Sequence, residues 1–374
     1  MKFIVSSSKL FQQLQAVGRV IAPKNSLQIL EDVLFDLNGN QLTLTASDGE
    51  TTIRTVVEVE NAEGAGKVAF QAKLLLETLK EFSEQPLTFS IDDNNFGLNI
   101  TSSNGTYSFV GANGNEYPEM PVEADMNGQF ALSTTVLLDA INKTIFCTAD
   151  DELRPVMNGI FFDLNDNKLT MVATDAHRLV RYTNNAVQAA APVSFILPKK
   201  PASILRNVLG KEEVEVKVTF GAKNARFEFG QTVIVCRQIE GRFPNYNAVI
   251  PQNNQNKVVV DRQTIVNACK RVAVFANTGT SLLKLALSEN KIKISAQDID
   301  FSTSAEETIA CSYEGAPMAI GFKAPFLIEI LASIASNDVL LELADPARAG
   351  LILPMENEED QDLLMLLMPM LLND

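Results

Sequence analysis

Residues 1–18 read MKFIVSSSKLFQQLQAVG, and the same arrangement of residue types returns twice along the chain. It recurs in residues 128–145, GQFALSTTVLLDAINKTI, and in residues 257–274, KVVVDRQTIVNACKRVAV. Each copy begins with a short β-rich run, continues through a polar break, and ends with apolar residues at helical spacing. A period of about 125 residues indicates one structural unit copied three times.

The match between the copies continues beyond these openings. Three aspartates that follow strand-like segments are spaced by 127 and 123 residues: Asp48, Asp175 and Asp298. Three prolines further on are spaced by 126 and 125 residues: Pro118, Pro244 and Pro369. A chain of 374 residues is long enough for three domains of common size, and we expect them at residues 1–126, 127–254 and 255–374.

Each copy also contains a shorter repeat. In the first copy, KFIVSSSKLFQQLQAV at residues 2–17 is echoed by KVAFQAKLLLETLKEF at residues 67–82. Every half begins with a strand, continues with one helix, and ends with several strands whose residues alternate, as in QLTLTAS at residues 41–47. The pattern predicts an α+β fold of antiparallel sheets with helices on one face, and six helices in all.

The chain is acidic, with a net charge of −15, but its basic residues concentrate on the predicted helices. The helical windows hold 14 basic and 5 acidic residues, whereas the remaining chain holds 17 basic and 41 acidic residues. The windows are 6–25, 72–83, 133–149, 198–211, 261–277 and 322–336. If these helices share a surface, it would attract duplex DNA without reading its sequence, because no recognition helix, zinc finger or aromatic RNA platform accompanies them.

Several kinds of site are not expected. The chain has no Walker A loop, no dinucleotide-binding fingerprint and no H-E-x-x-H motif. Its four cysteines lack metal-ligand or redox spacing, which favours reduced thiols in the cytoplasm, and we expect neither a metal nor a cofactor. The longest apolar stretch, 363–372, is interrupted by Pro369 and is too short to span a membrane. The acidic run 356–362 is expected to be a solvated loop before the last strand.

The single histidine, His177, follows Asp175 by two residues. Two such residues on a strand share a face, so a hydrolase that uses an Asp175–His177 dyad is one alternative. A hydrolase would also need a nucleophile and an oxyanion hole, and the chain has no G-x-S-x-G elbow. We therefore favour a non-enzymatic protein with no catalytic residues.

Together with the triple repeat, three segments resemble a known family over the whole chain. They are VATDAHRLVR at residues 172–181, EGRFPNYNAVIP at residues 240–251, and MPMLL at residues 368–372. The family is the bacterial sliding clamp, the β subunit of DNA polymerase III. The resemblance implies a DNA-clamp fold of three similar domains, in which helices line a central pore and antiparallel sheets form the outside.

The resemblance also implies function and partners. Two chains would form a head-to-tail homodimeric ring that encircles double-stranded DNA and tethers the replicative polymerase for processive synthesis. The partners would be the polymerase α subunit, an ATP-dependent clamp loader, and other polymerases and repair proteins that bind through short peptide motifs. Contacts to DNA would be weak and non-specific, because tight base readout would stop sliding.

Site residues follow from the resemblance position by position. Partner peptides would bind a surface whose walls are Met157, Thr174, Ala176, His177, Arg178, Leu179, Pro244, Val249, Leu366, Met368, Pro369 and Met370. The pore would present Lys24, Lys73, Lys199, Lys200 and Arg206 to DNA. The dimer would join Tyr107 and Phe109 of one subunit to Val274 and Phe275 of the other.

The chain departs from the family pattern at a few positions. Leu371 stands where a basic residue is common, Met157 stands where a leucine is usual, and Asn373 and Asp374 extend the tail. The first of these changes removes a polar contact that partner peptides would otherwise meet. A protein-interaction scaffold that never encircles DNA remains a further alternative to the clamp.

Overall fold

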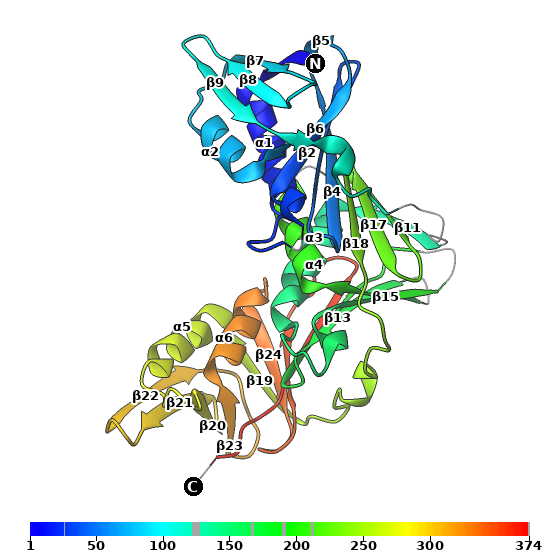
Figure 1. Ribbon diagram of the computed structural model, residues 1–374. Coiled ribbons are helices and arrows are strands. Elements are labelled where there is room, and N and C mark those ends of the chain that lie inside the picture. Colours follow the sequence, from blue (N-terminus) through cyan, green and yellow to red (C-terminus); the bar gives the residue numbers. More distant parts are fainter. Residues whose placement is uncertain (26, 122–127, 166–167, 189–191, 211–212, 373–374) are drawn as a thin grey trace. The chain divides into compact units, whose positions relative to one another are not determined.

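A computed structural model of the chain describes residues 1–25, 27–121, 128–165, 168–188, 192–210 and 213–372 (Figure 1). In these residues, the order of one strand, one helix and three strands occurs six times, with two further short strands in the first repeat. The predicted strand–helix–strand halves and the α+β class are therefore confirmed. The expected boundary at residues 126 and 127 lies outside the described residues.

The first helix of each repeat starts where the polar break provides a capping side chain. Ser6 Oγ accepts a hydrogen bond from the Lys9 backbone N–H at 3.1 Å, and Asp261 Oδ1 accepts one from Thr264 at 2.7 Å. Ser133 Oγ does the same for the Val136 N–H at 3.2 Å. Such caps satisfy backbone donors that a first helical turn leaves unpaired.

The structure contains six α-helices in its described part. They are α1 (Ser7–Gly18), α2 (Ala72–Lys80), α3 (Thr134–Thr144), α4 (Lys199–Val208), α5 (Arg262–Ala273) and α6 (Ala324–Ser333). Short 3₁₀ turns are η1 (Gln28–Glu31), η2 (Gly114–Glu116), η4 (Ile145–Cys147), η5 (Pro155–Met157) and η6 (Tyr246–Ala248). The window 6–25 is too long, because the helix ends at Gly18 in tighter turns before Pro23, so Lys24 lies on a loop.

The chain divides into two compact units, and the first comprises residues 1–138 and 203–238. Its first sheet has the order β5 (Glu60–Glu63), β1 (Lys2–Ser6), β7 (Pro86–Ile91), β8 (Gly97–Thr101), β9 (Thr106–Val110). Its second sheet has the order β10 (Ala112–Asn113), β6 (Gly66–Gln71), β2 (Asp32–Asn38), β3 (Gln41–Ser47), β4 (Thr51–Glu58), β18 (Thr232–Arg237), β17 (Asn224–Phe229), β16 (Glu215–Phe220), β11 (Gly128–Ser133). All strand pairs in both sheets are antiparallel.

The second unit comprises residues 139–202 and 239–374. Its larger sheet has the order β15 (Val193–Pro198), β12 (Gly159–Asn165), β13 (Lys168–Thr174), β14 (Arg178–Asn184), β26 (Gln361–Leu367), β25 (Gly350–Pro354), β24 (Asp338–Leu343), β19 (Asn256–Asp261). Its smaller sheet has the order β22 (Thr303–Ala310), β21 (Lys291–Asp298), β20 (Leu282–Ser288), β23 (Met318–Lys323). These pairs are antiparallel too, so the predicted sheet type is confirmed.

Sheet pairing joins one repeat to the next. In the first unit, β4 of the first repeat pairs with β18 of the second, and Ile53 faces Ile234. In the second unit, β14 of the second repeat pairs in the same way with β26 of the third, and Leu179 faces Leu366. Each joint is formed by the third strand after the helix of a first half and the third strand after the helix of the following repeat's second half.

The helices bury one apolar stripe against these sheets. In α1, the buried residues Leu10, Leu14 and Val17 follow helical spacing, and the helix lies beside α2 in the first unit (Figure 1). In the second unit, α5 and α6 lie side by side and pack on the strands of the smaller sheet. Burial of such a side chain contributes about 1.5–3 kcal/mol, so these stripes hold each helix in place.

The acidic run 356–362 differs in part from the expected solvated loop. Its first residues are exposed, but β26 begins at Gln361 and includes Asp362, which pairs with Arg181 at 2.9 Å. Lys143 Nζ lies 3.4 Å from Glu358 and 2.8 Å from Asp139, and it is buried above the Tyr182 ring. Lys143 is therefore a buried partner of nearby carboxylates and should not be counted among the basic residues available on the helix surfaces.

Asp32 gives the first unit a pH-dependent stability. Burial, with a smaller contribution from Glu31, raises the pKa of Asp32 to about 6. Since the unfolded carboxyl has its ordinary pKa near 4, the folded state holds a proton that the unfolded state releases. The free energy of unfolding should fall as pH rises from about 4 to about 6, and Asp32→Asn should restore about 1 kcal/mol at pH 7, after allowance for partial exposure.

The matched control is Asp36→Asn on the same strand, where the carboxylate meets Lys67 at 3.7 Å on the surface. Urea unfolding of both variants at pH 4.5 and pH 7 separates the two positions. The control should be no more stable than the parent chain at either pH. If Asp32→Asn changed the free energy of unfolding equally at the two pH values, the raised pKa of Asp32 would be contradicted.

Candidate functional site

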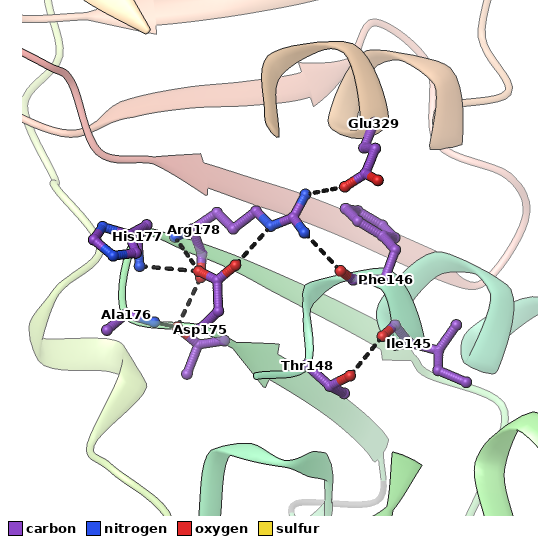
Figure 2. Close-up of polar contacts among 9 residues, drawn as sticks. Ile145, Phe146, Thr148, Asp175, Ala176, His177, Arg178 and Glu329 are labelled. Carbon is purple, nitrogen blue, oxygen red and sulfur yellow. Dashed lines mark hydrogen bonds and ion pairs between the residues drawn. The ribbon is translucent and has the colours of Figure 1, made fainter. Parts of the chain in front are cut away.

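The turn between β13 and β14 is built on one aspartate. Asp175 Oδ1 accepts hydrogen bonds from the backbone N–H groups of His177 and Arg178, each at 3.0 Å (Figure 2). Ala176 takes a left-handed conformation, with φ of 72°, which lets the chain reverse within three residues. The Asp175 side chain is therefore engaged by the backbone of its own turn.

The same turn occurs in the other two repeats. Asp48 Oδ1 accepts from Glu50 at 2.9 Å and from Thr51 at 2.7 Å. Asp298 Oδ1 accepts from Asp300 at 3.0 Å and from Phe301 at 3.2 Å. The aspartates that mark the sequence repeat are thus turn caps. The Asp175 carboxylate accepts two backbone N–H groups of its own turn and the Nε–H of Arg178, so this geometry gives no support to a catalytic dyad.

Arg178 follows the exposed residues of this turn, and its own side chain is buried and bonded to several partners. Its Nε donates to Asp175 Oδ2 at 2.9 Å, Nη2 donates to the Phe146 carbonyl at 2.8 Å, and Nη1 pairs with Glu329 of α6 (Figure 2). The guanidinium also lies 5.2 Å from the Phe146 ring centre and 4.3 Å from that of Phe326. Burial opposes its charge, but the bonds to Glu329 and Asp175 outweigh burial and raise the pKa of Arg178.

An apolar cluster lies behind this turn. Thr174 faces Leu179, and Leu179 faces Leu366, so three predicted peptide-site residues stand side by side on adjacent strands. Leu179 and Leu366 belong to one buried cluster of the second unit with Val172, Ile196, Phe243, Ile250, Ala349, Leu351 and Leu364. This cluster fixes the sheet on which the predicted surface is built.

Three other predicted wall residues adjoin members of this cluster in sequence, and two are placed by backbone hydrogen bonds. Val156, Phe243 and Ile250 pack in it and are the sequence neighbours of Met157, Pro244 and Val249. The Met368 backbone N–H donates to the His177 carbonyl at 2.8 Å, and the Met370 N–H donates to Gly321 of β23 at 2.8 Å. Ala176, His177, Val249 and Met368 are exposed, whereas Thr174, Arg178, Leu179 and Leu366 are buried. All twelve residues lie in the second unit.

The predicted pore residues are surface cations. Lys73, Lys200 and Arg206 are exposed on α2 and α4, and Lys24 is exposed on the loop after α1. Lys199, at the start of α4, is partly exposed, and its Nζ lies 3.4 Å from Asp150 Oδ2. Within each compact unit, these residues present positive charge on or beside helices.

The predicted dimer residues lie at sheet ends. Tyr107 and Phe109 belong to β9, the last strand of its sheet, and Val274 and Phe275 follow α5, which packs on the end strand β22. Val274 is 79% exposed, and two neighbours that were not predicted are similarly open: Val110 at 81% and Phe301 at 74%. Large apolar side chains exposed beside open strand edges are typical of surfaces that associate.

The sequence analysis missed Glu329, Phe146 and Phe326, which contact Arg178 in addition to Asp175. Glu329 is 151 positions from Arg178, so no local pattern connects them. The one available signal is that Glu329 is the sole acidic residue of the α6 sequence APFLIEILAS. A lone acid within an apolar helix often has a specific basic partner.

Other classes of site are not seen among the described residues. No three His, Cys, Asp or Glu side chains gather there as metal ligands would. Cys147, Cys236 and Cys269 are buried free thiols, and burial raises the pKa of both Cys236 and Cys269 to about 12. None of the helices in the described ranges has the length and apolar character needed to cross a membrane.

Comparison with known proteins gives the same pattern across the chain. Models of the DNA polymerase III beta subunit match in succession: the N-terminal domain at residues 1–121, the central domain at 131–245 and the C-terminal domain at 247–371. A beta sliding clamp of Haemophilus influenzae is 28% identical over 373 residues, covering 99% of this chain and all of that protein. The crystal structure of the DNA polymerase III beta subunit of Pseudomonas aeruginosa has a TM-score of 0.93, with 27% identity and full coverage of both chains. A sliding clamp structure of Bartonella birtlesii has the same TM-score at 28% identity.

The six helices and antiparallel sheets in three repeats are the three-domain DNA clamp fold. The chain belongs to the DNA polymerase III beta-subunit family, the beta sliding clamps, and serves as a non-catalytic processivity factor of that polymerase. DNA and a DNA polymerase are therefore its partners. The expected family is confirmed, and the hydrolase alternative is wrong.

Arg178→Met tests the packing around the turn. The variant leaves the largely buried Asp175 carboxylate and the Phe146 carbonyl without their partner, so it should lower the free energy of unfolding by about 3 kcal/mol. Arg348→Met, which removes an exposed pair with Asp345, is the matched control and should change stability by less than about 0.5 kcal/mol. Urea unfolding at one chain concentration measures the free energy of unfolding of both variants. An equal decrease in the two would contradict the buried contacts of Arg178.

Proposed function

We propose that two copies of this chain close head to tail into a ring that encircles duplex DNA and tethers the replicative polymerase. The observation that carries this proposal is that two end strands, which correspond to the strands joining one repeat to the next, have no such joint within the described chain. Within the described chain, β9 ends one sheet and β22 ends another. An open edge presents unpaired backbone groups, and pairing with a second chain satisfies them.

The repeat pattern supports a specific joint. Strands β4, β14 and β22 are the third strands after the helix in the first halves, and β18, β26 and β9 are the third strands after the helix in the second halves. Two of the three possible joints occur within the chain, β4 with β18 and β14 with β26. The third, β22 with β9, would join one copy to the next, with Val274 and Phe275 meeting Tyr107 and Phe109. Such a joint is heterologous, so two of them close a dimer.

Charge supports a DNA-facing inner surface. The proposed pore residues are Lys24, Lys73, Lys199, Lys200 and Arg206, in a protein of net charge −15. Diffuse cations of this kind attract phosphates without base contacts, and the acidic remainder repels DNA from the outside. Weak, sequence-independent attraction is what sliding requires.

The surface around the β13–β14 turn is the proposed peptide site. Its exposed side chains include Met368 and Val249, and the nearby residues Leu366 and Ile250 belong to the buried apolar cluster. Methionines adapt to varied ligands, and one or two apolar anchors usually dominate such binding. Met157, Thr174, Ala176, His177, Leu179, Pro244, Leu366, Pro369 and Met370 would complete the walls, with Arg178 holding them in position.

Partners and organisation follow from the clamp function. We infer binding to the polymerase α subunit, to an ATP-dependent loader, and to other polymerases and repair proteins that carry peptide motifs. We propose domain boundaries at 126/127 and 254/255, and a cytoplasmic location, where the bacterial chromosome is copied. A scaffold that never encircles DNA is the remaining alternative.

Retention on DNA separates the ring from the scaffold. When the protein has been loaded on nicked circular DNA, it should stay bound at salt that removes ordinary phosphate contacts, because a closed ring is held topologically. Cutting the circle should release the protein, so that it no longer elutes with the DNA on gel filtration. Loss at equal rates from circular and linear DNA would contradict encirclement.

A further inference from the structure

Lys323 is a partly exposed cation beside the proposed peptide site. It is the last residue of β23, and its ammonium lies 4.8 Å from the ring centre of Phe326 on α6. The same ring is approached by the Arg178 guanidinium at 4.3 Å and by the exposed His177 ring at 6.1 Å. The Phe326 ring therefore lies next to the charged groups of Lys323 and Arg178 and to the His177 imidazole.

The two cations differ in what neutralises them. Arg178 is paired with Asp175 and Glu329 and is buried. Lys323 has no carboxylate within ion-pair distance in the described part of the chain, and it is partly exposed. Contact with the electron-rich face of Phe326 restrains its ammonium without cancelling its charge.

The C-terminal segment brings Lys323 next to the proposed walls. The Met370 N–H donates to Gly321, two residues before Lys323 on β23, and the Met368 N–H donates to the His177 carbonyl. This segment therefore runs from the turn of the site along the end of β23. It contributes no cation of its own, because Leu371 is apolar and 81% exposed.

We propose that Lys323 is a specificity-determining residue, which selects partner peptides that carry an acidic side chain beside their apolar anchors. The inference rests on the proposed function of this surface as a peptide site. Apolar anchors give most of the affinity, and a restrained cation at the edge discriminates between charged and neutral neighbours. Because the pair would be solvent-accessible, its effect should be modest and sensitive to salt.

Fluorescence polarisation of labelled nine-residue peptides tests the proposal. The peptides share two leucines and a phenylalanine, and they differ only in an Asp or an Asn placed in turn at each flanking position. At one position or more, the full-length chain should bind the Asp peptide about threefold more tightly at low salt, with the difference lost at 1 M salt. Lys323→Met should abolish this preference, so that it binds the Asp and Asn peptides equally, whereas Lys323→Arg should keep the preference.

Lys291→Met, at an exposed lysine on β21, is the matched control and should retain the preference. Equal binding of the Asp and Asn peptides to the parent chain at every position would overturn the role of Lys323. So would an unchanged preference in Lys323→Met. Failure of all the peptides to bind the parent chain would instead contradict the peptide site itself, and with it this inference.

Discussion

Antiparallel pairing of end strands is the constraint on which the rest of this structure depends. Each half of a repeat supplies three strands that combine with the opening strand of the other half, and the units so formed fuse where β4 meets β18 and β14 meets β26. Those two joints bury apolar side chains across repeats, as Leu179 and Leu366 do. Three repeats in one chain can make only two such joints. The corresponding strands β9 and β22 therefore remain at the ends of their sheets in the described chain. A closed assembly is the physical remedy for open edges.

The repeats share a backbone but differ in what they present at corresponding joints. The Met368 N–H bonds the His177 carbonyl in the second unit, and the Arg237 N–H bonds the Glu50 carbonyl in the first. In the first unit this position carries an exposed ion pair of Arg237 and Glu50, at 3.8 Å. In the second unit the corresponding position carries the exposed Met368, close in sequence to Leu366 of the apolar cluster, and Arg178, whose charge is paired with Asp175. The same geometry therefore offers an apolar surface in only one of the two units.

Sequence patterns predicted the parts of this protein that local chemistry determines. The caps at Ser6 and Asp261, the alternating strands and the six halves all follow from residues close together in the chain. The end of α1 was misjudged because apolar residues continue past Gly18, where Val20 is buried outside the helix. Lys143 pairs with Glu358, which is 215 positions away, and Arg178 pairs with Glu329, which is 151 positions away. No periodicity in the sequence reveals contacts at such separations. Asp175 was identified as a marker of the repeat, but only the hydrogen bonds of its carboxylate show that it caps a turn.

The most direct test of the account is the mass of two edge variants, measured by light scattering alone and mixed. One carries Tyr107→Asp and Val110→Asp on β9, and the other carries Val274→Asp and Phe275→Asp directly after α5, the helix that packs on β22. In a head-to-tail dimer every joint needs one edge of each kind, so each variant alone should be a monomer of about 40.9 kDa. Their mixture should regain one intact joint and reach about twice that mass. A dimer formed by either variant alone, or a mixture that stays monomeric while the parent chain dimerises, would contradict the joining of β9 to β22.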